Sequence, residues 1–157
     1  MMMIQNAWKQ LAMILSLSLI GALILRVVDP IAKAEVSCDP STIAADEICL
    51  RTVIDEWKSD CVWIDARRRV DWQKDGLAGS LLLTTAEGEN FELLLEQAFP
   101  ILAQKNQRVV VYCSDAGCGT SREIAKRLRE YQLVPDVKAL HGGWKALSQA
   151  GLIPRKP

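Results

Sequence analysis

The sequence has 157 residues with 19 basic and 19 acidic side chains, so its formal net charge is zero and its isoelectric point is near 6.6. This length allows one domain with an appendage, and the balanced charge argues against a nucleic-acid-binding protein held by a basic surface. Because half of the residues are apolar and a quarter are charged, extensive disorder is not expected. The single histidine, His141, excludes a histidine-rich metal site, and no cofactor is predicted.

The beginning of the chain differs from the rest. An uncharged run of 15 residues, Leu11–Leu25, has Lys9 before it and Arg26 after it. Residues 1–34 carry three basic and one acidic side chain, whereas residues 35–157 carry 16 basic and 18 acidic ones. The neutral total therefore combines a cationic apolar leader with a mildly acidic domain.

This leader has two interpretations. A cleaved signal peptide has a basic start, an apolar run of about 7–15 residues and a small-residue cleavage site, for which Ala32–Ala34 is the candidate. An uncleaved anchor needs about 20 apolar residues, or about 17 at the least, and Leu11–Val28 provides 18 when Arg26 extends its charged head to the interface. We favour an anchor that contacts the membrane through residues 8–28, because Arg26 and the distance to the cleavage site fit a signal peptide poorly.

The sequence thus predicts three parts: a membrane anchor or signal sequence at 1–28, a linker at 29–44 and one domain at 45–157. The charges that flank the apolar run leave its orientation open under the positive-inside rule. Cys38 and Cys49 lie 11 residues apart, and in an oxidising compartment they can form a disulfide that leaves Cys61 unpaired. We therefore expect the domain on the non-cytoplasmic, periplasmic side, with a cleaved secreted form as the alternative.

The domain begins with alternating helix and strand patterns. Apolar residues at helical spacing predict a helix over 45–57, and the apolar run Cys61–Ile64 predicts a buried strand that ends in a charged turn, Asp65–Arg69. After a turn at Gly76–Gly79, the next strand is expected at Leu81–Leu83. A helix follows, whose predicted buried face comprises Phe91, Leu94, Leu95, Ala98 and Leu102, with Pro100 trimming its end.

The second half of the domain continues the alternation. The run Val109–Tyr112 is β-branched and aromatic, so it predicts the clearest strand of the chain. The next helix has one apolar face, formed by Ile124, Leu128 and Tyr131. A last strand is expected at Val137–Leu140 and a short helix at Trp144–Ala150. Strands that alternate with helices predict an α/β fold with a parallel sheet.

The candidate active site follows the predicted strand Val109–Tyr112. Sites of open α/β sheets lie at the carboxyl ends of strands, and here Cys113 precedes a loop of small residues and a helix with Thr120 as N-cap and Glu123 as its capping-box partner. Backbone N–H groups of such a loop and the positive helix end stabilise an anion. They lower a thiol pKa from about 8.5 towards about 3.5–7.5, which creates a nucleophile at neutral pH. The alternative is that Cys113 is only a small buried residue.

The predicted anion-binding loop comprises Ser114, Asp115, Ala116, Gly117, Gly119, Thr120, Ser121 and Arg122. Cys118 lies in the same loop, five residues after Cys113. Three interpretations are open for Cys118: the true nucleophile, a resolving thiol that closes a disulfide with Cys113, or a packed small residue. Two thiols without further ligands make an incomplete zinc site, so no metal is predicted.

Four stretches, in the family's order, resemble the rhodanese-like domains over about residues 45–155. They are similar to the strand ending in Asp-x-Arg, the acidic-aromatic pair with its following turn, the active-site strand and loop, and the Gly-Gly-aromatic turn: Trp63–Arg67, Asp71–Ser80, Val109–Ser121 and His141–Trp144. The resemblance implies a sulfurtransferase, in which Cys113 takes sulfane sulfur from a small donor such as thiosulfate and passes it from its persulfide to a thiol acceptor.

The resemblance also implies roles for neighbouring residues. Thr120 and Ser121 match the hydroxyl residues at the helix start, and Asp65 and Arg67 match the supporting Asp-x-Arg pair. The Cys-x4-Cys loop and the apolar leader resemble a membrane-anchored, single-domain branch of the family. The alternatives are a thiol-disulfide redox or sulfur-binding module that uses Cys113 and Cys118 without thiosulfate turnover, and an inactive scaffold that binds a partner.

The sequence departs from the family pattern in its charges. Many family loops carry Arg or Lys, whereas this loop has Asp115 and is two residues longer than usual. The nearest cation is Arg122, and the run Arg67–Arg69 is either a solvated turn or another source of positive potential. Gly119 stands where related phosphatases and arsenate reductases have arginine, so these activities are disfavoured.

Overall fold

The computed structural model of the protein describes residues 38–104, 108–114 and 119–153, all within the unit Ala34–Pro157. In this described part of the chain, no helix is both long and apolar enough to cross a membrane. The predicted anchor at residues 8–28 lies outside the described residues, and the domain boundaries stay predictions.

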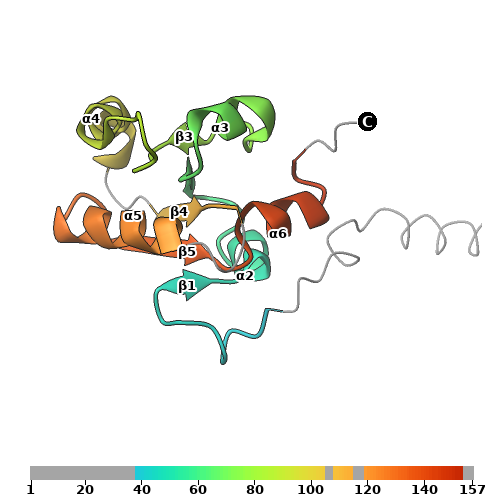
Figure 1. The fold of residues 1–157 in the computed structure, drawn as a ribbon. Helices are drawn as coiled ribbons and strands as arrows, with labels where there is room; N and C mark the ends of the chain where they lie inside the picture. Colours follow the sequence, from blue (N-terminus) through green and yellow to red (C-terminus); the bar gives the residue numbers. More distant parts are fainter. Residues whose placement is uncertain (1–37, 105–107, 115–118, 154–157) are drawn as a thin grey trace, which may run out of the picture. The chain divides into compact units, whose positions relative to one another are not determined.

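Parallel strands form one sheet with the order β1-β5-β4-β2-β3. The strands are β1 (Glu47–Ile48), β2 (Val62–Asp65), β3 (Leu81–Leu82), β4 (Arg108–Tyr112) and β5 (Asp136–Leu140). Figure 1 shows the labelled strands β1, β5, β4 and β3 in this order from bottom to top. The central position of β4 agrees with its sequence, since a strand buried on both faces needs an uninterrupted apolar run. The predicted α/β fold with a parallel sheet is confirmed.

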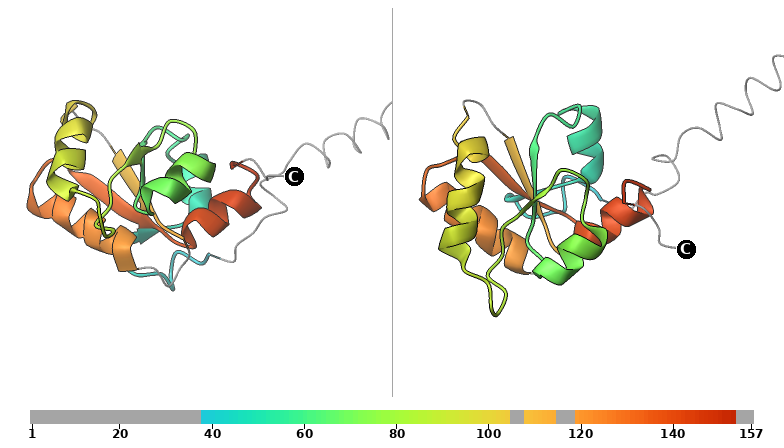
Figure 2. Two further views of the ribbon diagram at one scale, coloured as in Figure 1. Left: turned by 45° about the horizontal axis from the view of Figure 1, so that its top comes forward. Right: turned by 90° about the horizontal axis from the view of Figure 1, so that it is seen from above.

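Helices cover both faces of the sheet. They are α2 (Leu50–Asp55), α3 (Arg69–Asp75), α4 (Phe91–Leu102), α5 (Gly119–Glu130) and α6 (Gly143–Gln149). Leu94 of α4 and Ile124 of α5 belong to one buried cluster, whereas Val53 of α2 and Leu147 of α6 belong to another. The right-hand view of Figure 2 shows α4 and α5 on one side of the strands and α2 and α6 on the other.

Strand β4 supplies both clusters, because successive side chains of a strand point to opposite faces. Val109 and Val111 pack with α4 and α5, whereas Val110 and Tyr112 pack with α2 and α6, and all four are fully buried. The same alternation places Cys113, which directly follows the strand, in the cluster of α4 and α5. The sheet thus fixes the side on which this thiol lies.

The predicted helix over 45–57 is wrong in its extent. Glu47–Ile48 forms an edge strand paired with Ala139–Leu140 of β5, and helix α2 covers six residues only. The charged turn expected after β2 is also shorter than predicted, because helix α3 begins at Arg69. Tyr131 is 47% exposed, contrary to its predicted place on the buried face of α5, because that helix ends at Glu130.

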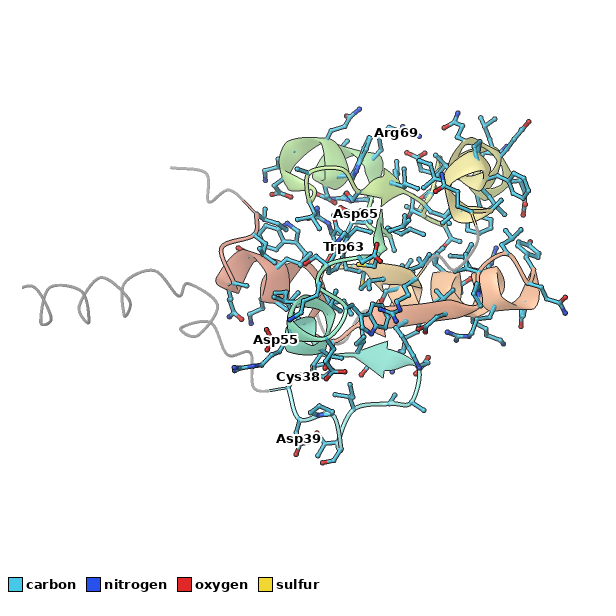
Figure 3. All side chains as sticks on the ribbon, turned by 180° about the vertical axis from the view of Figure 1, so that it is seen from behind. Cys38, Asp39, Asp55, Trp63, Asp65 and Arg69 are labelled. Carbon is cyan, nitrogen blue, oxygen red and sulfur yellow. A yellow bond between two sulfur atoms is a disulfide. The ribbon has the colours of Figure 1, made fainter. Side chains whose placement is uncertain are left out.

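The predicted disulfide is confirmed. Cys38 is bonded to Cys49, with their Cα atoms 5.7 Å apart, and Cys61 is free. The bond connects the first described residue to the residue that precedes helix α2, and Figure 3 marks Cys38. The segment between them therefore has both ends attached to the domain.

Candidate active site at the end of strand β4

The carboxyl ends of β2 and β4 meet at one edge of the sheet. Asp65 ends β2, Tyr112 ends β4, and the two residues are partners in the strand register. The segments that follow these strands, together with the loop after β3, line a pocket of about 310 Å³. Its lining comprises Ala66, Arg67, Arg68, Asp71, Thr84, Thr85, Ala86, Cys113, Ser114 and Thr120.

Cys113 lies at this pocket with its backbone held in place. Its side chain is 1% exposed, and its carbonyl oxygen accepts a hydrogen bond of 2.6 Å from the Trp144 N–H at the start of α6. The next carbonyl, that of Ser114, accepts one of 3.3 Å from the Lys145 N–H. These bonds attach the end of β4 to helix α6 and fix where the sulfur lies.

The Cys113 sulfur is disulfide-bonded in this structure. Cys38 and Cys49 are bonded to each other, and Cys61 is free. The remaining predicted loop residues, Asp115, Ala116, Gly117 and Cys118, lie outside the described residues. Because a disulfide sulfur is not a thiolate, Cys113 must be reduced before it reacts as a nucleophile.

Helix α5 forms another part of the wall, and its start differs from the prediction. The helix already includes Gly119, so Thr120 is its second residue and not its N-cap. Thr120 lines the pocket, and Ser121 is 4% exposed. Arg122 does not line the pocket; its Nη1 atom lies 3.7 Å from Oε1 of Glu47 on strand β1. Arg122, the cation that the sequence places nearest to Cys113, therefore interacts with the Glu47 carboxylate instead of the pocket.

Asp65, the last residue of β2, and Arg67, which lines the pocket, form a buried ion pair, and Figure 3 marks Asp65. Their side chains are 0% and 7% exposed. Arg67 Nη2 donates to Asp65 Oδ2 at 2.8 Å, Arg67 Nε donates to Oδ1 at 3.0 Å, and the Arg67 backbone N–H donates to Oδ1 at 2.9 Å. Such a two-pronged pair is strong and directional, so it fixes the turn that leaves strand β2.

The remaining donors of Arg67 hold helix α3. Its Nη1 donates to Asp75 Oδ1 at 2.9 Å, and Nη2 lies 3.4 Å from the carbonyl oxygens of Asp71 and Asp75. The guanidinium carbon lies 5.3 Å from the centre of the Trp144 ring. Burial lowers the pKa of Arg67, but the hydrogen bond and charge of Asp65 and the hydrogen bond of Asp75 outweigh it, so that this pKa is raised. Arg67 therefore stays charged and uses its donors within the protein.

Tyr112 connects the end of β4 to the turn after α3. Its hydroxyl accepts a hydrogen bond of 2.9 Å from the Leu77 N–H and lies 3.2 Å from Ser80 Oγ. Burial, and after it the charge of Asp65, raises the pKa of Tyr112, so the hydroxyl stays neutral. Sequence analysis did not single out Tyr112, although an aromatic residue next to the candidate cysteine was a usable signal.

Part of the pocket wall was not apparent from the sequence. Thr84 is fully buried, and its hydroxyl donates to the Ala66 carbonyl at 2.9 Å and accepts from the Ala86 N–H at 3.1 Å. Arg68 has a side chain that is 70% exposed, with its Nε 2.9 Å from Oδ2 of Asp71. Loops that follow parallel strands gather at one sheet edge, and this rule was the signal available for Thr84. Among the described residues, no group of three potential metal ligands is present.

A comparison with protein families identifies the family of this chain. The model of the rhodanese-like domain matches residues 50–150. The chain belongs to the rhodanese-like domain family. This family is commonly involved in sulfur transfer. The matched residues of this rhodanese-like domain include every described residue that lines the pocket.

Solved structures similar to this rhodanese-like domain have low sequence identity. The BH2092 protein of Bacillus halodurans has a TM-score of 0.51 at 15% identity, over 67% of this chain and 72% of that one. The CoADR-RHD protein of Bacillus anthracis, in its reduced form, has 0.45 at 15%, over 70% and 18%. A protein of Rhodopseudomonas palustris described as a possible tyrosine phosphatase has 0.44 at 18%, over 68% and 81%. No curated protein sequence matches. Because its sequence identity is only 15%, the first of these structures supports the fold alone.

Proposed function

We propose that this protein is a sulfurtransferase in which reduced Cys113 carries sulfane sulfur as a persulfide. The observation that carries this proposal is the position of Cys113, which directly follows the central strand β4 and lines a pocket of about 310 Å³ together with Thr120 of helix α5. Helix α5 has 12 residues, and the N–H groups of its first turn supply positive potential at its start. Such an environment favours a thiolate and the negative outer sulfur of a persulfide.

The proposed reaction has two sulfur transfers. In the first, the Cys113 thiolate attacks the outer sulfur of thiosulfate; an S–S bond forms, the S–S bond of thiosulfate breaks, and sulfite leaves with the electron pair. In the second, the acceptor thiol gives its proton to the outer sulfur of the Cys113 persulfide, the resulting acceptor thiolate attacks that sulfur, and the electron pair of the broken bond returns to Cys113. The acceptor leaves as a persulfide that keeps the proton, so no external oxidant or reductant is needed.

Intact-mass measurement of the full chain in mild detergent tests the proposal. The protein is reduced, freed of reductant and incubated with thiosulfate; the expected product is heavier by about 32 Da, one sulfur atom. Cyanide should then remove this sulfur as thiocyanate. Cys113→Ser should lower turnover by at least about a thousandfold, because the nucleophile is removed.

Cys61→Ser is the matched control. Cys61 is free, and burial, followed by the charge of Asp60, raises the pKa of its thiol to about 11. It is therefore protonated at neutral pH and should not carry sulfur. Full turnover in Cys113→Ser, or a sulfur adduct that maps to another cysteine, would remove the proposal.

The disulfide bond of Cys113 favours a second candidate function, a thiol-disulfide redox module. We propose Cys118 as the partner, because the other cysteines are either bonded to each other or free. In this function the reduced protein loses about 2 Da on oxidation and gains no sulfur. A Cys118→Ser variant discriminates: it should retain the sulfur adduct if the protein is a sulfurtransferase, and it should lose all cycling if the pair is a redox couple.

We also propose that the protein is a membrane-anchored member of the family, attached through residues 8–28 with its domain in the periplasm. The Cys38–Cys49 disulfide supports an oxidising compartment, since such bonds are rare in reducing ones. Alkaline extraction should leave the protein in the membrane fraction, and a membrane-impermeant thiol reagent should label it in cells after mild reduction. Extraction into the soluble fraction would favour the cleaved secreted form.

A further inference from the structure

The wall of the pocket that follows strand β2 carries two opposite charges. Arg68 precedes helix α3, Asp71 lies in its first turn, and both line the same pocket as Cys113. Their side chains are joined by one hydrogen bond, of 2.9 Å from Arg68 Nε to Asp71 Oδ2, and the Asp71 backbone N–H donates to the Arg68 carbonyl at 3.0 Å. Among the described residues, the terminal nitrogens of Arg68 and Oδ1 of Asp71 have no hydrogen bond. The wall therefore presents unused donors beside an unused acceptor.

The neighbouring arginines do not offer the same groups. Arg67 donates to Asp65 and Asp75 and is 7% exposed. Arg69 donates through both Nε and Nη2 to the Glu89 carboxylate, at 3.0 and 2.8 Å, and is not part of this pocket. Of these three adjacent arginines, only Arg68 combines contact with the pocket and unused donors.

We propose that Arg68 and Asp71 bind the carboxylate and the ammonium group of an amino-acid thiol that accepts sulfur from Cys113. This inference rests on the proposed sulfurtransferase function and names its acceptor class. Guanidinium pairs with carboxylate through two parallel hydrogen bonds, and a carboxylate accepts from ammonium. A zwitterion therefore satisfies both side chains, whereas an inorganic anion satisfies Arg68 alone.

The ion pair between Arg68 and Asp71 can separate with a small loss of free energy. The Arg68 and Asp71 side chains are 70% and 32% exposed, and an ion pair exposed to solvent contributes little to stability. The volume of about 310 Å³ is at the small end of ligand pockets, which suits an amino-acid-sized molecule. With its zwitterion on this wall, the acceptor extends its thiolate towards Cys113, attacks the outer persulfide sulfur and leaves as the persulfide, while Cys113 regains its thiolate.

Three small acceptors separate the two charges. Cysteine carries both groups, 3-mercaptopropionate lacks the ammonium, and cysteamine lacks the carboxylate. Steady-state kcat/KM is measured for each in the full-length protein with thiosulfate as donor, and divided by kcat/KM for cyanide in the same protein. Because all acceptors attack the same persulfide, this ratio removes any effect of a variant on the loading step.

Each variant should change a different set of ratios. Arg68→Gln should lower the ratios of cysteine and 3-mercaptopropionate about three- to tenfold and raise that of cysteamine, because Asp71 is then free of its partner. Asp71→Asn should lower the ratios of cysteine and cysteamine by a similar factor and raise that of 3-mercaptopropionate, because Arg68 is then free of its partner. Arg69→Gln, the matched control, should change none of them.

Other outcomes would overturn the inference. If Arg68→Gln lowers all three ratios equally, the arginine does not distinguish acceptors; if neither variant changes a ratio, the wall does not bind them. These results differ from failure of the proposed function, in which thiosulfate adds no sulfur to Cys113 and cyanide yields no thiocyanate in the wild-type protein.

Discussion

The two walls of the pocket are built in different ways. The wall after β2 consists of charged side chains that are tied to one another, with Asp65 and Arg67 buried and paired. The wall formed by the end of β4 and the start of α5 offers a thiol, hydroxyls and backbone groups. Its Cys113 is held by the hydrogen bond that the Trp144 N–H donates to the Cys113 carbonyl. Ion pairs within the protein fix the shape of the first wall. The groups proposed to react lie on the second wall.

The two walls should therefore respond differently to substitution, one mainly in stability and the other mainly in turnover. On the wall after β2, a change in a supporting residue should reduce the free energy of unfolding before it affects chemistry. On the wall of β4 and α5, changes in the reacting groups should reduce turnover with less effect on stability. Cys113→Ser should have the largest effect on turnover.

Asp65→Asn should have the largest effect on stability. The variant leaves the buried Arg67 guanidinium without its main carboxylate, and breaking a buried ion pair lowers the free energy of unfolding by about 3–5 kcal/mol. Urea denaturation of the full-length protein measures the loss. Asp55→Asn is the control, since Asp55 and Arg51 form an exposed pair and should contribute less than about 1 kcal/mol. Equal losses would show that Asp65 has no special structural role.

Gly76, which follows helix α3, and Gly119, the first residue of helix α5, should respond differently to substitution by alanine. At Gly76 a Cβ atom would lie 2.6 Å from the backbone oxygen of Trp72, so Gly76→Ala should destabilise the protein by about 1–3 kcal/mol. At Gly119 the described residues place no atom within 4 Å of such a Cβ apart from the chain neighbours and the backbone of the same helix, and alanine is the better helix former. Thermal unfolding should show a lower Tm for the first variant only; a loss at Gly119 would contradict this reasoning.

Tyr112→Phe should have a smaller effect, because it breaks the connection between the walls without leaving a cavity. The variant leaves the Leu77 N–H without its acceptor, which lowers the free energy of unfolding by about 1–2 kcal/mol. Denaturant midpoints at constant slope measure the loss. Tyr131→Phe is the control on an exposed tyrosine, and it should change the midpoint within error.

The smallest expected effect concerns Cys61, which precedes β2 as Cys113 follows β4. Its pKa is raised to about 11 by burial and then by the Asp60 charge, from an ordinary value of 9.0. At pH 8 iodoacetamide should therefore label Cys61 slowly in the folded protein and faster in urea. Since the folded pKa is the higher one, this thiol contributes stability below pH 9 that is lost as the pH rises through about 11. Equal labelling rates in both states would contradict the shift.

Sequence patterns predicted those elements whose stability is local or rests on an uninterrupted apolar run. Val109–Tyr112 was predicted from its composition alone, because any strand buried on both faces needs such residues. Helix α4 followed from its apolar face, with Pro100 in its last turn. The position of Cys113 at the carboxyl end of the best strand was available for the same reason.

Elements that depend on distant partners were not predictable. Strand β1 has two residues and exists because Glu47–Ile48 pairs with Ala139–Leu140, far along the chain. Helix α3 has no buried residue and a polar sequence; its end is held by Arg67 and by the hydrogen bond of 3.2 Å from Trp72 Nε1 to the Ser80 carbonyl. Neither pattern has a periodicity that a local analysis detects.

The sequence by itself determined the family, the parallel α/β fold and the cysteine on which the proposed chemistry depends, because strand composition and motif order are local properties. Only the tertiary structure decided what Arg67, Arg68 and Arg69 do. Three identical side chains in a row meet different carboxylates: Arg67 pairs with Asp65 and Asp75, Arg68 with Asp71, and Arg69 with Glu89. Whether an arginine is buried, faces the pocket or lies outside it depends on the chain path after β2, and that path is set by contacts between residues distant in sequence.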